Sequence, residues 1–408
     1  MKRVALFPSA FHPSLGGVEE LTGQLAVHLK KRGIGSLICV NQWPRDLPAL
    51  ERWKGFAVRR FPFRLPEYGL KAKVSFYLSR KWIMRSVVGA LERFKADAVH
   101  VQCVSSNAWY ACEAAAALNL PLIVSVQGER TMDAQDIYCK SPLYNRILRR
   151  VLAKADQVTA CSAATLADIE GFMGGTLGQK TKVIYNGVGS EAFEDGTKWP
   201  HSKPYFFAMG RLVPQKGFVV LLEAYARANF NFTDLLIAGD GPDFDFLEAY
   251  AGTLGIADRV HFTGRAGRSM VQSLLRGCRG LVVPSLREPM GIVALEGMAA
   301  GKPLLVSCVG GLKEIAVEGP WCRHAPPGDV AALSRGLLWM ESLEGEEGGR
   351  TQREGAERFL WERLVSDYVS TYKSAAESFE KKLEGKETGW SGSDLSKREK
   401  VMASDSTG

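Results

Sequence analysis

The sequence predicts an α/β protein made of two doubly wound domains, each a parallel sheet covered by helices on both faces. Short apolar runs alternate with helical patterns along most of the chain. A Gly-, Ser- and Pro-rich stretch without periodicity interrupts this alternation after residue 186. The 408 residues are enough for two domains with separate cores. We therefore expect an N-terminal domain over residues 1–190, a hinge over 191–204 and a second domain over 205–355.

Composition narrows the class of protein and its partners. A content of 46% hydrophobic and 24% charged residues is ordinary for a globular protein, and no apolar run is long enough to span a membrane. The net charge of +8 favours anionic partners, without choosing between nucleotide phosphate, nucleic acid and anionic lipid. Eight scattered cysteines form no Cys-x-x-Cys pair. This pattern favours reduced thiols in a cytoplasmic protein over disulfides or zinc.

The first domain begins with a strand that leads into Gly16 and Gly17, where a helix starts. A strand, a glycine turn and a helix bring backbone close to phosphate, although a plain tight turn fits equally well. Open parallel sheets bind ligands beyond the carboxyl ends of their strands. His100 lies inside an apolar run and is expected to be a buried, hydrogen-bonded histidine rather than a base. The predicted strands are 4–7, 36–40, 57–61, 98–101, 122–126, 158–161 and 183–185, and the residues that follow them are Gln102, Gln127, Gly128, Glu129, Ser162 and Asn186.

Basic and aromatic residues are interleaved over residues 43–95, and a helix is expected there from about Lys73. Such a helix could lie on an anionic membrane surface. An ordinary solvated face over a packed core explains the same pattern, and both interpretations stay open. No recognised DNA- or RNA-binding module is present, so we expect no nucleic acid partner.

The second domain repeats the alternation, with predicted strands at 205–209, 234–238, 260–263, 281–283 and 304–307. Its first strand ends in a glycine loop that contains Arg211 and Lys216. A guanidinium grips phosphate oxygens in pairs and an ammonium acts as a point charge, so this loop suits a phosphate ligand. The second strand runs into another glycine loop, residues 239–242. Each loop alone could be a simple turn.

The stretch from Pro284 to Gly301 organises the candidate site. A buried strand ends before it, and a helix is expected from about Met290 to Gly301. Glu288 then lies on the loop before the helix, and Glu296 projects about two turns into it. Free N–H groups at the helix start make an anion site, and two carboxylates beside phosphate suit hydroxyl-rich partners such as ribose and sugar rings. The alternative is that both glutamates are solvated residues near a helix start.

Together, residues 208–217 and 238–242, and the two glutamates with seven residues between them, resemble the retaining GT-B glycosyltransferases of family 4, the glycosyl transferases group 1. Residues 16–19, 184–188 and 310–314 extend the resemblance over roughly residues 1 to 340. It implies the GT-B fold, in which two doubly wound Rossmann-like domains face a central cleft. It also implies a C-terminal helix, here 356–382, that crosses back to the first domain. Beyond it, the polar composition predicts a disordered tail over 383–408.

The resemblance also implies roles for individual residues. Arg211 and Lys216 would hold the donor diphosphate, Glu296 the ribose and Glu288 the transferred sugar. Many relatives have a histidine where this chain has Gln127, and glutamine cannot shuttle protons. The catalytic candidates are Glu288, Arg211 and Lys216; the donor-binding candidates are Gly16, Gly17, Gly210, Arg211, Lys216, Gly239, Gly241, Met290, Gly291, Ile292 and Glu296; and the acceptor-binding candidates are Glu19, Gln127, Gly128 and Glu129.

We therefore expect a retaining hexosyltransferase that uses a UDP-, GDP- or ADP-sugar and no cofactor. The acceptor would be a sugar or a lipid-linked sugar in glycolipid or surface polysaccharide synthesis, and the protein cytoplasmic or peripheral on the inner membrane face. Transfer should be metal-independent, because Asp243 and Asp245 fit the capping of a helix start better than a metal site. The alternatives are a sugar-nucleotide epimerase or phosphorylase on the same fold, and a non-catalytic scaffold that binds anionic lipid through residues 43–95.

Overall fold

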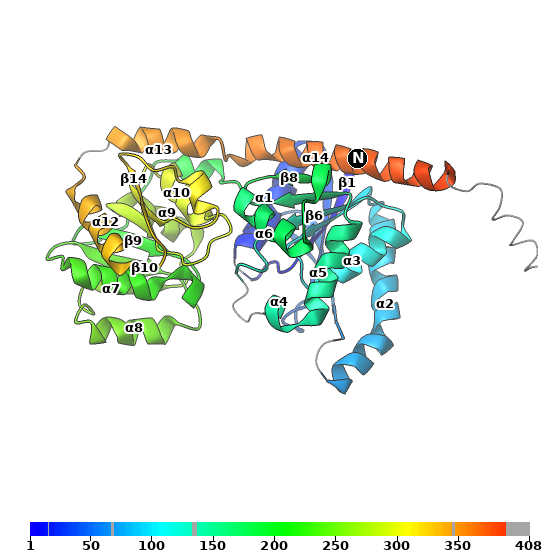
Figure 1. Ribbon diagram of the computed structural model, residues 1–408, viewed down its shortest axis with the longest axis horizontal. Coiled ribbons are helices and arrows are strands. Elements are labelled where there is room, and N and C mark those ends of the chain that lie inside the picture. Colours follow the sequence, from blue (N-terminus) through cyan, green and yellow to red (C-terminus); the bar gives the residue numbers. More distant parts are fainter. Residues whose placement is uncertain (15, 67–68, 133–136, 345–346, 389–408) are drawn as a thin grey trace, which may run out of the picture.

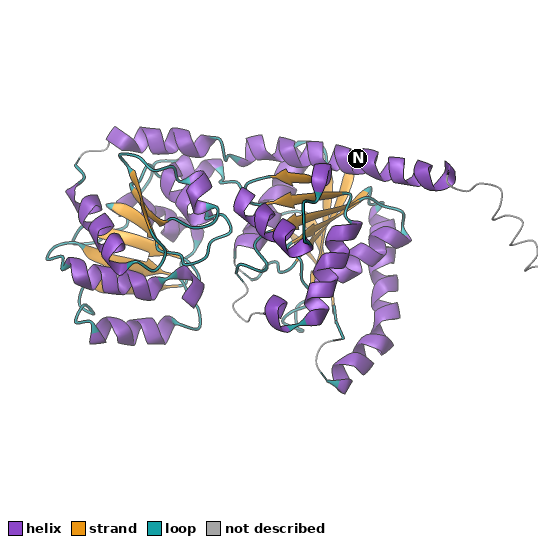
Figure 2. Ribbon diagram, in the orientation of Figure 1, coloured by secondary structure: helices purple, strands orange, loops and turns teal. Residues whose placement is uncertain are grey.

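The computed structural model describes residues 1–14, 16–66, 69–132, 137–344 and 347–388. It contains an eight-stranded sheet and a six-stranded sheet, which lie side by side with helices on both faces of each (Figures 1 and 2). The predicted α/β class with two parallel-sheet, Rossmann-like units is therefore confirmed.

The first sheet is parallel except for one edge strand. Its strands are β1 (Arg3–Pro8), β2 (Gly35–Asn41), β3 (Leu50–Trp53), β4 (Phe56–Phe61), β5 (Ala98–Gln102), β6 (Leu122–Val126), β7 (Gln157–Ala160) and β8 (Thr181–Val183). They lie in the order β3-β4-β2-β1-β5-β6-β7-β8. β3, which the sequence did not predict, pairs antiparallel with β4. The helices around this sheet are α1 (Gly17–Lys31), α2 (Leu70–Phe94), α3 (Ser106–Ala117), α4 (Ile137–Lys140), α5 (Pro142–Lys154) and α6 (Ala163–Met173).

The second sheet is parallel throughout the pairs that join its strands. Its strands are β9 (Tyr205–Met209), β10 (Asp234–Ala238), β11 (Val260–Gly264), β12 (Gly280–Val283), β13 (Leu304–Ser307) and β14 (Cys322–Ala325), in the order β11-β10-β9-β12-β13-β14. β14 was not predicted. The helices are α7 (Phe218–Ala228), α8 (Phe244–Thr253), α9 (Arg268–Gly277), α10 (Ile292–Ala299), α11 (Leu312–Ile315), α12 (Val330–Ser342) and α13 (Glu347–Glu357).

The strand order places the ligand-binding edge of each sheet. It reverses between β1 and β5 in the first sheet and between β9 and β12 in the second. Loops that leave neighbouring strands in opposite directions open a crevice at such a point, beyond the carboxyl ends of the strands. The segments that follow β9 and β12 contain Arg211, Lys216 and Glu288, so the topology brings these three residues to one edge.

The last helix, α14 (Trp361–Thr388), runs from the second domain back across the first (Figure 1). Trp361, Tyr368 and Tyr372 are fully buried in the core that α1, β1 and β2 share. The Tyr372 hydroxyl lies 2.8 Å from Nδ1 of His100, whose Nε2 lies 2.7 Å from the Ser125 hydroxyl. Burial lowers the pKa of His100 to about 3. His100 is thus the buried, hydrogen-bonded histidine that the sequence predicted.

The last helix is longer than the sequence predicted. α14 continues six residues beyond Lys382, so the predicted disordered tail starts too early. Residues 389–408 of that tail lie outside the described residues. The cysteines whose side chains are described are all free thiols, most of them buried. Across the part of the chain that the structure describes, no helix is both long and apolar enough to cross a membrane.

Candidate active site

The loops at the carboxyl ends of β9, β10 and β12 pack against one another through their backbones. The N–H of Leu286 donates to the carbonyl oxygen of Gln215 over 2.8 Å, which joins the β12 loop to the β9 loop. A Cβ on Gly239 would overlap the carbonyl oxygen of Gly210, so the β9 and β10 loops approach as closely as their glycines permit. The three glycine-containing stretches that the sequence singled out are therefore one structural unit.

Lys216 and Glu288 form an ion pair inside this unit. Nζ of Lys216 lies 2.6 Å from Oε2 of Glu288, and the Ser285 hydroxyl donates to the same oxygen over 3.0 Å. Glu288 is buried, and Lys216 is partly buried. The Glu288 carboxylate therefore has both a cation and a hydroxyl donor as partners. A cation and an anion therefore lie side by side at the carboxyl edge of the second sheet.

The turn that follows β13 packs against the backbone of Glu288. Gly310 has a φ of +51°, and a Cβ there would overlap the carbonyl oxygen of Glu288. The N–H of Gly311 donates to that same carbonyl over 3.2 Å. Only glycine allows this approach, which explains why the Gly310-Gly311 pair belongs to the pattern that suggested the resemblance.

The amino end of α10 lies at the boundary with the first domain. Gly291, with a φ of +100°, precedes the helix, which starts at Ile292. The N–H groups of Gly291 and Ile292 donate to no backbone carbonyl in the described part of the chain. A Cβ on Gly17 would lie 3.8 Å from Cδ1 of Ile292. Gly17 of the first domain therefore lies beside the start of this helix.

The segment that follows β6 contacts Pro289, in the loop that precedes α10, which is called the α10 loop below. Gly128 lies so close to Pro289 that a Cβ would overlap the proline ring. The hydroxyl of Ser162 donates to the carbonyl oxygen of Pro289 over 2.6 Å. Oε1 of Gln127 accepts a hydrogen bond from the Asn186 side chain over 3.0 Å. Gln127 and Gly128 thus lie beside the α10 loop, together with two residues singled out because they follow strands.

The two glutamates predicted to bind the acceptor, Glu19 and Glu129, both accept hydrogen bonds from residues of the first domain. Glu129 is buried, and its carboxylate accepts hydrogen bonds from the backbone N–H groups of Val104 and Gln127 over 2.7 and 2.9 Å. Burial raises the pKa of Glu129, and these backbone bonds oppose that shift. Glu19 accepts a hydrogen bond from the Ser14 hydroxyl over 2.8 Å. The Glu129 carboxylate therefore fixes the shape of the loop that carries Gln127 and Gly128.

Glu296 lies in a charged cluster that the sequence did not reveal. Nη1 of Arg268, at the start of α9, is 2.6 Å from Oε1 of Glu20 on α1. Arg268 also pairs with Glu191, in the segment 191–204 between the two domains, which is called the linker below. Burial raises the pKa of Glu296 to about 7; Arg268 lowers it, and Glu20 and Glu191 raise it further. Arg268 thus joins both domains and the linker beside Glu296. No spacing or motif marks Arg268 in the sequence, so only the fold could reveal it.

Arg211 and the acidic pair at 243 and 245 differ from the rest. Arg211 is exposed on the same loop as Lys216, and it forms no ion pair with any residue that the structure describes. It is therefore placed at the rim of the loop unit rather than inside the Lys216–Glu288 pair. Asp243 immediately precedes α8, but its side chain makes no capping hydrogen bond, so that expectation is wrong. Asp245 lies in the first turn, where a negative charge is favourable.

Sequence reasoning also left Glu314 without a separate role. Its carboxylate accepts hydrogen bonds from the N–H groups of Ala163 and Ala164, both over 2.9 Å, at the start of α6 in the first domain. The Tyr185 hydroxyl donates to it as well. Glu314 therefore caps a helix of the other domain and holds the two sheets together.

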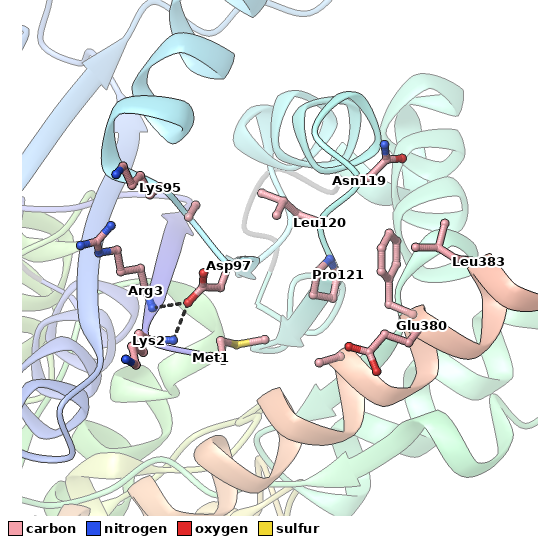
Figure 3. A pocket seen from close by; sticks show the side chains of 13 residues that line it. Met1, Lys2, Arg3, Lys95, Asp97, Asn119, Leu120, Pro121, Glu380 and Leu383 are labelled. Carbon is pink, nitrogen blue, oxygen red and sulfur yellow. Dashed lines mark hydrogen bonds between the residues drawn. The ribbon is translucent and has the colours of Figure 1, made fainter.

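Two hollows of the molecule lie elsewhere. One, of about 820 Å³, lies at the amino edge of the first sheet, where Asp97 accepts hydrogen bonds from the N–H groups of Lys2 and Arg3 and where α14 forms one wall (Figure 3). The other, of about 1490 Å³, lies between the linker, the start of β13 and α13. Neither is lined by a predicted site residue. The candidate site is therefore identified by the loops that meet at the boundary between the two domains, and not by either of these hollows.

Two family models match the chain in tandem. Residues 16–187 match the Glycosyl transferase 4-like domain, and residues 190–358 match the Glycosyl transferases group 1 model. The junction of the two matches falls between β8 and β9, where the chain passes from one sheet to the other.

Solved structures share the fold at low sequence identity. Sucrose-phosphate synthase from Thermosynechococcus elongatus is 19% identical, with a TM-score of 0.75 over 93% of this chain and 100% of that chain. The Anabaena protein HepE, crystallised with UDP-glucose, is also 19% identical, with a TM-score of 0.67 over 93% of this chain and 100% of that chain. These likenesses establish the GT-B fold.

Curated relatives are closer in sequence. Two uncharacterized glycosyltransferases of Methanocaldococcus jannaschii are similar: one is 32% identical over 48% of this chain and only 55% of its own length, and the other is 26% identical over 91% and 98%. The uncharacterized glycosyltransferase YqgM of Bacillus subtilis is 30% identical over 71% of this chain and 80% of its own length. With both family models matched in order on a GT-B fold, the chain belongs to the glycosyltransferases that join a 4-like domain to a group 1 domain.

Proposed function

We propose that this glycosyltransferase is a retaining, metal-independent enzyme that moves a sugar from a nucleoside diphosphate sugar to an acceptor hydroxyl. The observation that carries the proposal is the Lys216–Glu288 ion pair, 2.6 Å long, beside the free amino end of α10 and opposite Gly17. A cation and backbone N–H groups suit a phosphate, and a carboxylate suits sugar hydroxyls. Both kinds of group lie at the one boundary that both domains share.

Each group has a place in donor binding. Lys216 and Arg211 neutralise the diphosphate, and the N–H groups of Gly291 and Ile292 bind its oxygens. Glu288 accepts hydrogen bonds from the transferred sugar once phosphate draws Lys216 away from it. Glu296 accepts hydrogen bonds from the ribose hydroxyls. The exposed position of Arg211 leaves its guanidinium available for an incoming phosphate.

The reaction needs charge stabilisation more than a strong base. The acceptor oxygen forms a bond to the anomeric carbon on the face from which the phosphate leaves, and the old carbon–oxygen bond breaks with its electron pair going to the phosphate. The acceptor proton passes to the leaving phosphate oxygen. Because the diphosphate gains negative charge in this step, a preset cation and helix N–H groups lower the barrier. Retention follows from attack and departure on one face, and NMR of the product anomer checks it.

Protein cations and N–H groups at this edge supply the charge that a divalent ion would otherwise supply to the diphosphate. We therefore expect transfer to continue in the presence of a chelator. Loss of transfer in EDTA at a temperature well below unfolding, with recovery on adding Mg²⁺ or Mn²⁺, would refute metal independence.

The donor class is proposed from the fold relatives. HepE, which shares the GT-B fold, was crystallised with UDP-glucose. UDP-glucose is therefore the first donor to test, followed by GDP- and ADP-sugars. A rise in melting temperature with one donor class identifies the base, because a ligand that binds only the folded state stabilises it.

We also propose that the acceptor lies at an anionic membrane surface on which α2 rests, in glycolipid or surface polysaccharide synthesis. One face of α2 is packed on the first domain through Phe76, Ile83 and Val87. On the opposite face, large apolar side chains are exposed at helical spacing: Leu70, Val74, Tyr77, Leu78 and Trp82. Lys71, Lys81 and Arg85 are exposed on that same face. An exposed apolar stripe with basic neighbours suits an anionic bilayer surface.

The test of the function uses substitutions in the ion pair. Lys216→Ala and Glu288→Gln should each lower transfer by at least about 100-fold, the range seen when a group that stabilises developing charge is removed. Lys373→Ala, which removes an exposed lysine of α14, is the matched control and should leave transfer unchanged. Melting temperatures show whether each variant is folded. A folded Lys216→Ala, Glu288→Gln double variant with full activity would contradict the proposal.

The same assay separates the alternatives. A transferase releases nucleoside diphosphate only when an acceptor is present, whereas an epimerase converts the donor without one. A phosphorylase uses inorganic phosphate as the sugar acceptor and forms a sugar phosphate. Family membership favours the transferase over those enzymes and over a non-catalytic scaffold.

A further inference from the structure

A cluster of metal-ligand side chains lies at the end of the second sheet that is opposite the candidate active site. Asp234 is the first residue of β10, His261 is the second residue of β11, and His201 lies in the linker before β9. Lys216 and Glu288 lie in the loops that follow the carboxyl ends of β9 and β12, whereas Asp234 and His261 lie at the amino ends of β10 and β11. The cluster is therefore separate from the glycosyl-transfer site.

The three side chains converge on one oxygen atom. Nε2 of His201 lies 2.9 Å and Nε2 of His261 lies 3.0 Å from Oδ2 of Asp234. The three candidate ligand atoms all lie within 4.8 Å of one another. With Zn–N and Zn–O bonds of about 2.0–2.2 Å, neighbouring ligands of a tetrahedral zinc ion are about 3.3 Å apart. The cluster therefore needs only small side-chain movements to surround an ion.

Burial and access also suit an ion. The Asp234 side chain is only 5% exposed, His201 is 17% exposed and His261 is 42% exposed. A buried carboxylate needs a partner, and the open side next to His261 leaves a path for an ion and for water as a further ligand. The two imidazole rings are close, with centroids 5.2 Å apart and planes at 68°, so both nitrogen atoms can turn toward one point.

The charges nearby set a limit on affinity. Nζ of Lys203 lies 3.4 Å from Oδ1, the second carboxylate oxygen of Asp234. The lysine leaves Oδ2 for an ion and holds the carboxylate in place, as outer groups of metal sites commonly do. Its positive charge also repels a cation, so we expect micromolar affinity instead of the much tighter binding of a closed structural site. Two imidazoles and one carboxylate favour Zn²⁺ or another divalent transition metal over Mg²⁺ or Ca²⁺.

We propose that His201, Asp234 and His261 bind one divalent transition-metal ion, best Zn²⁺, which fastens the linker between the domains to the second sheet. Within this set only His201 comes from the linker, and the other two come from neighbouring strands. The ion would stabilise the folded state and fix the end of the linker next to β9. It takes no part in sugar transfer.

The experiment titrates metal-stripped full-length protein with Zn²⁺ by calorimetry and with Co²⁺ by visible spectroscopy. We expect one equivalent per chain with micromolar affinity, a Co²⁺ spectrum without thiolate bands, and a higher melting temperature with metal. His261→Gln and His201→Gln should weaken binding at least tenfold and abolish the metal-dependent rise in melting temperature. His261 is partly exposed, so its replacement should not prevent folding. His12→Gln, at an exposed histidine of the first domain, is the matched control.

Equal binding by His12→Gln and His261→Gln would overturn the proposal, because the ion would then be bound elsewhere. Thiolate bands in the Co²⁺ spectrum, or no binding by the wild-type protein at micromolar Zn²⁺, would overturn it too. Sugar transfer is measured in parallel. Loss of metal binding in His261→Gln with transfer retained at low temperature keeps this result separate from the proposed function.

Discussion

Glu296 is a carboxylate whose pKa lies close to neutrality. Burial is the main cause of its rise to about 7. Because the ordinary value is near 4.3, the folded protein binds the proton more tightly than the unfolded chain between these two values. The free energy of unfolding contributed by Glu296 is therefore greatest below about pH 4, falls as the pH rises, and reaches its minimum above about pH 7. The difference is on the order of 1 to 3 kcal/mol.

Glu296→Gln should remove this part of the pH dependence. We expect the wild-type protein to lose stability between pH 5 and pH 8 relative to the variant, as measured by urea unfolding at several pH values. Glu248→Gln, at an exposed position of α8, is the control and should follow the wild type. Parallel pH profiles for wild type and Glu296→Gln would show that Glu296 has an ordinary pKa.

At the scale of single residues, the sequence predicted those whose role depends on local spacing. Glu288 lies on the loop before α10, and Glu296 lies about one turn into that helix. A strand–loop–helix pattern in the sequence is enough to predict both positions. Arg268 could not be found in this way. Its partner Glu20 lies 248 positions away and becomes a neighbour only after both sheets have folded. The same holds for Glu314, which caps a helix about 150 positions earlier in the chain.

At the scale of elements, the exposed apolar face of α2 leads to a specific prediction about membrane binding. Leu78 and Trp82 are 79% and 63% exposed on its outer face. Replacing both by glutamate places two charges where apolar side chains would enter the bilayer, so binding to phosphatidylglycerol-containing vesicles should fall at least tenfold in a sedimentation assay. Replacing Lys81 or Arg85 by glutamine should cost about 1 kcal/mol of vesicle binding each, since each removes one cation near the surface. Transfer to a water-soluble acceptor should be unchanged.

The control for α2 uses exposed apolar residues on the other domain. Phe246 on α8 and Leu338 on α12 are 56% and 47% exposed. Replacing both by glutamate makes the same change of charge away from α2 and should leave vesicle binding intact. If this control weakens binding as much as the α2 variant does, the net charge of the protein, and not α2, determines binding.

The elements that sequence reasoning missed are short and lie at sheet edges. β3 has only four residues, none of them buried, so it lacks an apolar core pattern and forms by pairing with β4. β14 consists of Cys322 to Ala325, and two polar residues lie between its buried ends. The central strands are recognised because both of their faces are covered by helices, which makes them continuous apolar runs. An edge strand receives much of its stability from its neighbour, and its own residues do not show this.

In the whole molecule, the two domains meet where loops from both surround the start of α10. Pro289 contacts Gly128 and accepts a hydrogen bond from Ser162, both of the first domain, while the adjoining Glu288 pairs with Lys216 of the second. The donor groups that we propose lie mostly on the second domain, and the acceptor groups on the first. Sugar transfer should therefore depend on this contact more strongly than donor binding does.

Gly128→Ala tests this dependence. The new Cβ would overlap the Pro289 ring, so the α10 loop and the first domain must move apart. Gly128 also has a φ of +89°, which by itself costs about 1 kcal/mol with alanine. We expect kcat to fall at least tenfold, because a displacement of about 1 Å at a reacting centre has effects of that size or larger. The affinity for nucleoside diphosphate, measured by calorimetry, should change less than twofold.

Gly174→Ala separates backbone strain from the contact between the domains. Gly174 has nearly the same φ, +86°, and among the described residues no atom beyond Gly174 and its two chain neighbours lies within 4 Å of the position that a Cβ would take. The two variants should therefore lose similar stability from strain, while only Gly128→Ala loses transfer. Equal kcat values would mean that the approach of the two domains at Pro289 does not control the reaction. A loss of nucleotide affinity as large as the loss of kcat would instead place Gly128 in donor binding, and the division of acceptor and donor groups between the two domains would be wrong.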